Sequence, residues 1–161
     1  MLIELLPRPV ARLGLRIAHR LRRYWRRLAR PQLRGVTVFL RDPSGQVLFV
    51  RHAYGADVWA LPGGGIARGE EPVAAAQREM AEELGVTLGK LRSLGTLEET
   101  LSGAPHVAFL YAATIEQTPT PDGREIVEAR FAAPDDPPRP LGALAQCRLD
   151  RLRAADADQP G

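Results

Sequence analysis

The sequence predicts an α/β domain with a mixed β-sheet and helices packed on it. Short stretches rich in β-branched and aromatic residues recur along most of the chain, separated by turn residues, and an alanine-rich helical stretch interrupts them at residues 72–84. Strands that flank a helix, with hairpins among them, are typical of a sheet layered with helices. A length of 161 residues suits one domain with a substantial core.

The strands before the helix are predicted from Gly35 onward. A β-branched and aromatic stretch, a turn with Pro43 at its second position and a return stretch predict a hairpin. A further short strand leads into three consecutive glycines. The three stretches are residues 36–40, 46–51 and 58–61.

Residues 72–84 carry helix signals at both ends. Pro72 suits a first helical position, where its missing N–H costs nothing, and three alanines follow at residues 74–76. Gly85 stands where a left-handed residue would end the helix. Glu71 stands at the N-cap, where Ser or Thr would cap better.

The chain after this helix predicts a second hairpin, one more strand and a closing helix. The hairpin turns around residues 102–105, where Ser, Gly and Pro cluster. The expected segments are the hairpin strands at 91–101 and 106–114, the strand at 126–131 and the helix at 141–153.

Glu79, Glu82 and Glu83 place three like charges on one face of the central helix. Each like-charge pair at this spacing destabilises an isolated helix by roughly 0.2–0.5 kcal/mol. The carboxylates also stand in the C-terminal half, where the helix dipole favours cations. A divalent ion such as Mg²⁺ resolves the conflict, because it takes carboxylate and phosphate oxygens as ligands. A solvated acidic face with an Arg78–Glu82 ion pair is the structural alternative.

The three acids are part of a longer pattern of fixed residues. Its positions are Gly64, Glu70, Arg78, Glu79, Met80, Glu82, Glu83, Gly85 and Val86. At every fixed position this stretch resembles the Nudix box, the signature of the Nudix hydrolase superfamily. The resemblance implies an α/β/α sandwich with a mixed β-sheet, in which the box forms a loop–helix–loop. It also implies hydrolysis of a diphosphate linkage with Mg²⁺, or with Mn²⁺ in its place.

The resemblance further implies roles for the polar residues of the box. Glu82 and Glu83 would be the main metal ligands. Glu79 would be the general base or a further ligand, oriented by Arg78. The carbonyl of Gly64 would offer another ligand atom to the metal.

Three further acids belong to the candidate site. Glu70 would support it through a ligand or through contact with one. Glu125 and Glu128 stand where the family often has an extra acidic ligand or base, and Glu125 is preferred because it lies at a loop-to-strand junction. Surface charge is the alternative for either residue. His52 and His106 are interpreted as ordinary strand-end residues.

Charge divides the chain into a basic leader and an acidic body. Residues 1–34 hold ten of the 22 basic residues and one acid, for a net charge of +9, and the other 12 basic and 18 acidic residues give −6. Apolar residues and arginines each recur at steps of three or four across residues 9–30, which predicts a basic amphipathic helix ended by Pro31. Such a helix would pack on the domain, lie on an anionic membrane or bind RNA phosphates.

We therefore divide the chain into a helical leader at residues 1–34, a Nudix-like domain at 35–155 and a tail at 156–161. The single cysteine, Cys147, excludes an internal disulfide and a cysteine-rich zinc site, and fits a reducing, cytoplasmic compartment. No apolar run approaches the roughly 18 residues of a membrane span, so any membrane contact would be peripheral.

A nucleotide-type small molecule is the expected substrate, and its identity stays open. Nucleoside triphosphates, oxidised nucleotides, nucleotide-sugars and 5′-triphosphate RNA ends all carry a suitable linkage. Two other function classes are open. A nucleotide-sensing Nudix domain without activity would usually have lost box residues, whereas this box is intact. An isoprenoid isomerase of the same fold would need a catalytic cysteine, and Cys147 stands far from the box in the closing helix.

Overall fold

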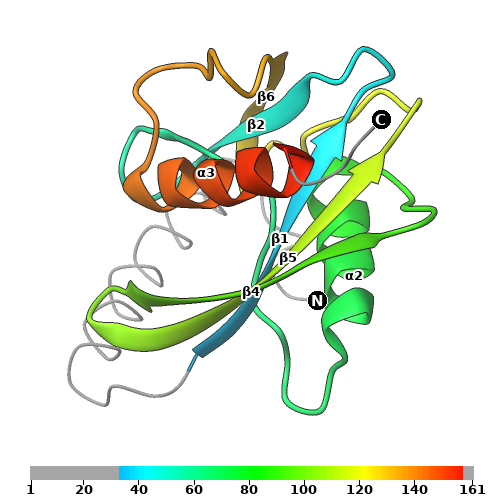
Figure 1. The fold of residues 1–161 in the computed structure, drawn as a ribbon. Coiled ribbons are helices and arrows are strands. Elements are labelled where there is room, and N and C mark those ends of the chain that lie inside the picture. The colour runs from blue at the N-terminus through cyan, green and yellow to red at the C-terminus, as the bar shows by residue number, and fades with distance from the viewer. Residues whose placement is uncertain (1–32, 158–161) are drawn as a thin grey trace.

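The computed structural model describes residues 33–157. The predicted helix at residues 9–30 and the last residues of the predicted tail, 158–161, lie outside the described residues. Figure 1 shows the described elements: β1 (Leu33–Arg41), β2 (Val47–His52), β3 (Trp59–Ala60), α2 (Pro72–Leu84), β4 (Arg92–Leu101), β5 (Ala104–Thr114), β6 (Ile126–Ala132) and α3 (Ala143–Ala157).

The six strands form one mixed sheet. β1 and β5 run parallel along the whole length of β1, from the Leu33–His106 pair to the Arg41–Thr114 pair. Every other strand pairing within residues 33–157 is antiparallel. The order across the sheet is β3-β2-β1-β5-β4, with β6 also paired to β2. The predicted mixed sheet is confirmed.

The two helices cover opposite faces of the sheet (Figure 1), because side chains along each strand alternate between two cores. On one face, Val38 and Leu40 of β1 share a core with Met80 of α2. On the other face, Phe39 shares a core with Leu149 of α3. This arrangement confirms the α/β/α sandwich.

The predicted hairpin between the first two strands forms only at its closed end. β1 pairs with β2 at Arg41 and Val47 alone. The glycine-rich segment takes the place of β2 beside the first half of β1, where the Val36 N–H donates to the Gly64 carbonyl (2.9 Å). Both segments carry strand signals, and local sequence patterns do not say which one pairs with β1. The pairing fixes Gly64 against the sheet.

α2 begins and ends where the sequence predicts. Pro72 occupies its first turn, and Glu71 at the N-cap makes no side-chain capping hydrogen bond. Gly85 adopts a left-handed conformation (φ 65°), and its N–H donates to the Ala81 carbonyl (3.1 Å). In the part of the chain that the structure describes, no helix is long and apolar enough to cross a membrane.

Several boundaries differ from the predicted ones. β1 begins at Leu33, before the predicted start of the domain. β5 begins at Ala104, because the turn that precedes it needs only Ser102 and Gly103, whose positive φ angles of 54° and 84° match the twist of antiparallel strands. α3 begins and ends later than predicted, and its last residues extend past the predicted end of the domain.

Candidate active site

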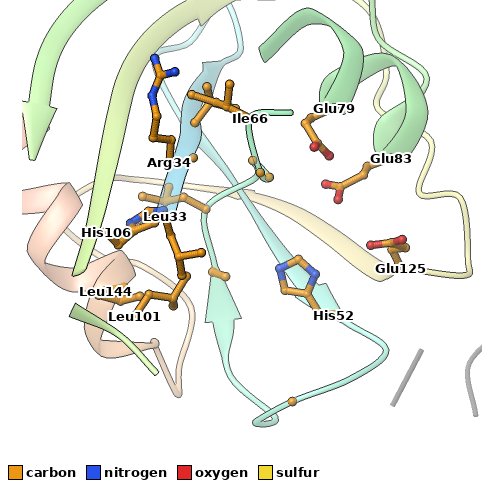
Figure 2. Close-up of a pocket in the computed structure, with 18 of the residues that line it drawn as sticks. Leu33, Arg34, His52, Ile66, Glu79, Glu83, Leu101, His106, Glu125 and Leu144 are labelled. Atoms are coloured by element: carbon orange, nitrogen blue, oxygen red, sulfur yellow. The ribbon is translucent and has the colours of Figure 1, made fainter. Parts of the chain in front are cut away.

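Five of the nine fixed residues of the Nudix-like box line a cleft of about 1150 Å³. Figure 2 shows its two ends. At one of them lie the carboxylates of Glu79, Glu83 and Glu125. Glu82, which also lines the cleft, completes the group that we call the acidic end. Aliphatic side chains that we call the apolar end line the other: Leu33, Leu101 and Leu144.

Glu83 is the most buried acid of the acidic end, with 6% of the residue exposed. Its Oε2 atom is buried without a hydrogen-bond partner among the described residues. Burial raises the pKa of Glu83 to about 9, and the negative charges of Glu79, Glu125 and Asp122 add to the rise. A buried carboxylate with an unpaired oxygen is destabilising unless a proton or a cation reaches it.

Glu79 lies against Gly64, so the first glycine of the box makes room for a carboxylate of α2. A Cβ built at Gly64 would clash with the carboxyl group of Glu79. The Glu79 side chain is 13% exposed, and burial raises its pKa against the opposing effect of Arg78. The Gly64 carbonyl, a predicted metal ligand, accepts the hydrogen bond from Val36, so a metal would use its second lone pair.

Arg78 connects the acids of the box. Its Nη1 donates to Glu79 Oε1 (2.9 Å) and to Glu82 Oε2 (3.3 Å), and its Nη2 donates to the Gly65 carbonyl (3.0 Å). The pKa of Arg78 is raised, first by its hydrogen bond to Glu70. The guanidinium therefore stays charged and orients the Glu79 carboxylate, which is the contact that the sequence predicts.

Glu70 anchors Arg78 from the loop before α2. Arg78 Nε donates to Glu70 Oε1 (2.8 Å) and Nη2 donates to Oε2 (3.0 Å). The Ala67 N–H also donates to Oε2 (2.8 Å). These hydrogen bonds, the Arg78 ones first, lower the pKa of Glu70 to about 2. Glu70 does not line the cleft, so its contact with the site runs through Arg78.

Glu82 stands at the mouth of the acidic end, with 63% of its side chain exposed. It lines the cleft and also forms the i,i+4 ion pair with Arg78 that the sequence offered as the structural alternative. The ion pair with Arg78 and a role in metal binding are therefore compatible for Glu82, because an exposed ion pair of this kind contributes little stability.

Of the two acids after the second hairpin, the structure brings Glu125 to the cleft and leaves Glu128 outside it. Glu125 Oε2 accepts a hydrogen bond from the Tyr54 hydroxyl (3.1 Å). Tyr54 packs against His52, with ring centroids 5.3 Å apart. Glu128 is 49% exposed and pairs with Arg51 (3.0 Å), so it has the surface role that the sequence left open.

The acidic end has the chemistry of a divalent-cation site. It supplies several carboxylate oxygens, which Mg²⁺ and Mn²⁺ accept as ligands, and Glu83 adds a buried oxygen without a partner in residues 33–157. Within the same residues, no three acids, histidines or cysteines enclose a ready-made metal position. The donor set fits Mg²⁺ or Mn²⁺.

The apolar end adjoins a charged network that sequence reasoning missed. His106 Nδ1 and Glu99 Oε1 are 2.8 Å apart, and each side chain is 7% exposed. Arg148 of α3 pairs with the same carboxylate. We call these three residues the charge-balanced network, so His106 is more than the strand-end residue predicted. A signal was present, because Glu99 lies two residues from both Leu97 and Leu101 along β4 and so shares their partly buried face.

Comparison with known proteins places most of this chain in one family of domains. The family model described as the NUDIX domain matches residues 31–151. An RNA pyrophosphohydrolase from Rhodospirillum rubrum is 44% identical over 55 residues, which cover 34% of this chain and 33% of that protein. Diphosphoinositol polyphosphate phosphohydrolase 2 from Rattus norvegicus is 39% identical over 80 residues, which cover 49% of this chain and 43% of that protein. The chain thus spans between a third and a half of the length of these curated relatives.

Solved structures share the fold over a larger part of the chain. A MutT NUDIX hydrolase from Burkholderia pseudomallei superposes with a TM-score of 0.69 and 25% identity, covering 76% of this chain and 98% of that one. The NUDIX domain of Shewanella oneidensis NrtR, solved with ADP ribose, superposes with a TM-score of 0.67 and 21% identity, covering 78% of this chain and 88% of that one.

Proposed function

This chain belongs to the NUDIX family, and we propose that it is a metal-dependent hydrolase that cleaves a diphosphate linkage in a nucleoside diphosphate derivative. One observation carries the proposal. At the acidic end, Glu83 has a buried oxygen without a partner among residues 33–157, beside the carboxylates of Glu79 and Glu125 (Figure 2). A bound cation would satisfy that oxygen and offset the repulsion among the carboxylates.

Glu82 and Glu83 would hold Mg²⁺ or Mn²⁺, with Glu79, Glu125 and the Gly64 carbonyl as further candidate ligands. When bound, such a metal neutralises phosphate oxygens and lowers the pKa of a bound water. The carboxylates by themselves would repel a diphosphate, because both groups are anionic. We therefore expect turnover to require the metal.

Glu79 would take the proton of the attacking water. Arg78 orients its carboxylate, and burial raises its pKa toward the neutral range in which a general base works best. The water oxygen forms a new bond to phosphorus, the bridging P–O bond breaks, and the leaving phosphate keeps the electron pair. The products are a nucleoside monophosphate and a phosphate ester, or pyrophosphate where the substrate is a triphosphate.

The apolar end supports an uncharged ring as the group attached to the diphosphate. Its walls are aliphatic, and the charge-balanced network beside it has a carboxylate for its arginine, Arg148. A ring with many phosphates would instead need several unpaired cations. Arg78 in the same cleft is paired with carboxylates, whereas Arg34 and Arg68 line the cleft and form no ion pair within residues 33–157. The aliphatic walls of the apolar end are therefore the observation that favours a nucleoside.

RNA with a 5′-triphosphate end is the second candidate substrate. The 44% identity to an RNA pyrophosphohydrolase over 55 residues favours it. The ten arginines of residues 1–34 would supply contacts for RNA phosphates. An RNA end would present the same linkage to the acidic end, with the rest of the strand outside the cleft.

A substrate panel in Mg²⁺ tests the proposal. It contains nucleoside triphosphates, an oxidised nucleotide, nucleotide-sugars, ADP-ribose and a 5′-triphosphate RNA, with phosphate detected after a coupling phosphatase where the product needs one. We expect turnover of at least one nucleotide, lost in excess chelator and recovered with Mn²⁺. Full activity in chelator would contradict the metal site. Tight binding of a nucleotide without turnover would indicate a sensing domain instead.

The leader would add peripheral contact with an anionic membrane, on a protein of the cytoplasm. An anionic surface attracts each nearby basic residue by about 1 kcal/mol, and the apolar stripe expected along residues 9–30 suits a bilayer interface. Removal of residues 1–32 should abolish binding to anionic vesicles and leave turnover intact. Loss of turnover would show that the leader packs on the domain, and binding to RNA but not to vesicles would favour the RNA role.

A further inference from the structure

Glu125 reaches the acidic end from a loop, whereas Glu79 and Glu83 stand on α2 (Figure 2), as does Glu82. A helix fixes its side chains relative to one another, but a loop residue needs contacts of its own to hold its position. Two contacts come from the chain after β2: the Tyr54 hydroxyl donates to the Glu125 side chain (3.1 Å), and the Ala53 N–H donates to the Glu125 carbonyl (2.8 Å). The others come from the segment before β6.

The first contacts join this loop to the end of α2. The Thr120 N–H donates to the Leu84 carbonyl (2.7 Å), and the Asp122 N–H donates to the Glu83 carbonyl (3.0 Å). Carbonyls in the last turn of a helix have no partner within the helix. The loop is therefore bonded to the same residue, Glu83, whose side chain enters the acidic end.

The second set of contacts comes from the Asp122 carboxylate. Its Oδ1 accepts hydrogen bonds from the N–H groups of Arg124 (3.0 Å), Glu125 (3.0 Å) and Ile126 (2.9 Å). Its Oδ2 accepts a further one from the Glu125 N–H (3.1 Å). One side chain thus fixes three consecutive peptide groups, with Glu125 at their centre. Short acidic side chains hold turns in this way.

The charge of Asp122 works against the site. A further negative charge near Glu83 adds to the repulsion at the acidic end, so electrostatics alone would favour a neutral residue here. We propose that Asp122 is a positioning residue that holds Glu125 in the cleft through the backbone of residues 124–126. This inference rests on the proposed metal-dependent activity. It assigns no contact between Asp122 and the metal or the substrate.

Two substitutions separate this role from the alternatives. Asp122→Asn keeps Oδ1, which makes three of the four hydrogen bonds, and removes the charge. Asp122→Ala removes all four. Asp42→Ala is a matched control, because Asp42 Oδ1 holds the turn after β1 through the N–H groups of Ser44 and Gln46 (2.9 Å each) and does not line the cleft.

The readout is Mn²⁺ affinity of the full-length protein, measured by calorimetry, with the melting temperature recorded for each variant. Residues that orient metal ligands change affinity by about 10–100-fold. We expect Asp122→Ala to weaken Mn²⁺ binding by about tenfold, close to the loss in Glu125→Gln, and Asp122→Asn to restore it to within a few-fold of the wild type. Because the two residues act together, adding Asp122→Ala to Glu125→Gln should produce little further loss. Asp42→Ala should lower the melting temperature alone.

Three results would overturn the inference. Asp122→Ala with wild-type Mn²⁺ affinity and a lower melting temperature would show a merely structural role like that of Asp42. Asp122→Asn as weak as Asp122→Ala would show that the charge matters and the geometry does not. If the wild-type protein binds no Mn²⁺, that result would contradict the proposed function itself. If Asp122→Ala does not fold, Asp122→Ser replaces it, because a shorter side chain with one oxygen cannot reach three peptide groups.

Discussion

The two ends of the cleft bury carboxylates in different ways. In the charge-balanced network, the Glu99 side chain is 7% exposed and faces both Arg148 and His106. At the acidic end, Glu83 is also buried but lies among other acids, and one of its oxygens has no partner in residues 33–157. The burial is similar, and the difference lies in the partners.

This difference separates a buried carboxylate that is satisfied by its own partners from one with an unsatisfied oxygen. A buried ion pair with its hydrogen bonds satisfied repays much of its desolvation, and breaking it is strongly destabilising. A buried polar atom without a partner costs about 1–3 kcal/mol. The acidic end therefore weakens the metal-free fold, and removal of charge should have opposite effects on stability at the two ends.

The largest expected effect is on turnover at the acidic end. Glu82→Gln with Glu83→Gln removes both predicted ligand charges while keeping the shape of the side chains. We expect the rate to fall by about 10⁴-fold, equivalent to about 5.5 kcal/mol in the barrier, with the fold retained in circular dichroism. Wild-type turnover in this double variant would show that the acidic end is not the metal site.

The second effect is on stability at the other end. Glu99→Gln removes the charge that faces Arg148 and His106, and should lower the free energy of unfolding by about 3 kcal/mol, because it leaves the Arg148 side chain, which is only 14% exposed, without a counter-charge. Urea unfolding measures the change. Glu98→Gln is the control, because Glu98 is the exposed neighbour on the opposite face of β4 and should change stability by less than about 0.5 kcal/mol. Equal stability of both variants would show that the network contributes nothing.

The third effect has the opposite sign. In the metal-free wild type, Glu83 keeps its proton up to a pKa of about 9, whereas in the unfolded chain it loses it near 4.5. The folded state therefore binds more protons between these values, and stability falls as pH rises through that window. Glu83→Gln removes this dependence. Its free energy of unfolding at pH 8 should be about 1–2 kcal/mol higher than that of the wild type.

Mg²⁺ should reverse the order of stability of the wild type and Glu83→Gln. A ligand that binds only the folded state stabilises it by mass action, and the wild type has the full donor set. Millimolar Mg²⁺ should thus raise the melting temperature of the wild type more than that of Glu83→Gln. A wild-type melting temperature that changes with neither pH nor Mg²⁺ would contradict the comparison between the two ends.

Local signals in the sequence were enough to place three carboxylates of the acidic end on one face of a helix, and the family resemblance added Glu125 as a candidate. Pro72 and Gly85 mark the ends of α2, and the i, i+3, i+4 spacing sets Glu79, Glu82 and Glu83 on one face of it. These features depend on residues close together in the chain, so a periodic pattern carries them. The fold class followed from the same kind of signal, applied to strands and turns.

Contacts between distant residues could not be predicted in this way. The parallel pairing of β1 with β5 joins Leu33 to His106, and the ion pair of the charge-balanced network joins Glu99 to Arg148. No local pattern relates these positions. Asp122 was missed for another reason: an acid in a loop has the same appearance in the sequence whether it is solvated or holds three peptide groups.

The smallest expected effect concerns Glu70, which contacts the site only through Arg78. Glu70→Gln keeps one hydrogen bond to the guanidinium and removes the charge, so the orientation of Glu79 should loosen without loss of any ligand. We expect turnover to fall by no more than about tenfold, with KM little changed.

Because Arg78 holds the pKa of Glu70 near 2, below its ordinary value of 4.5, the stability that Glu70 adds is present above pH 4.5 and lost as pH falls toward 2. Glu70→Gln should therefore leave the pH–rate profile above pH 5 in place, whereas Glu79→Gln should remove its acid limb, since Glu79 is the proposed base. Glu71→Gln is the matched control, because Glu71 is exposed and makes no capping hydrogen bond, and it should match the wild type in both rate and profile. A shifted acid limb in Glu70→Gln would mean that Glu70 itself exchanges the proton.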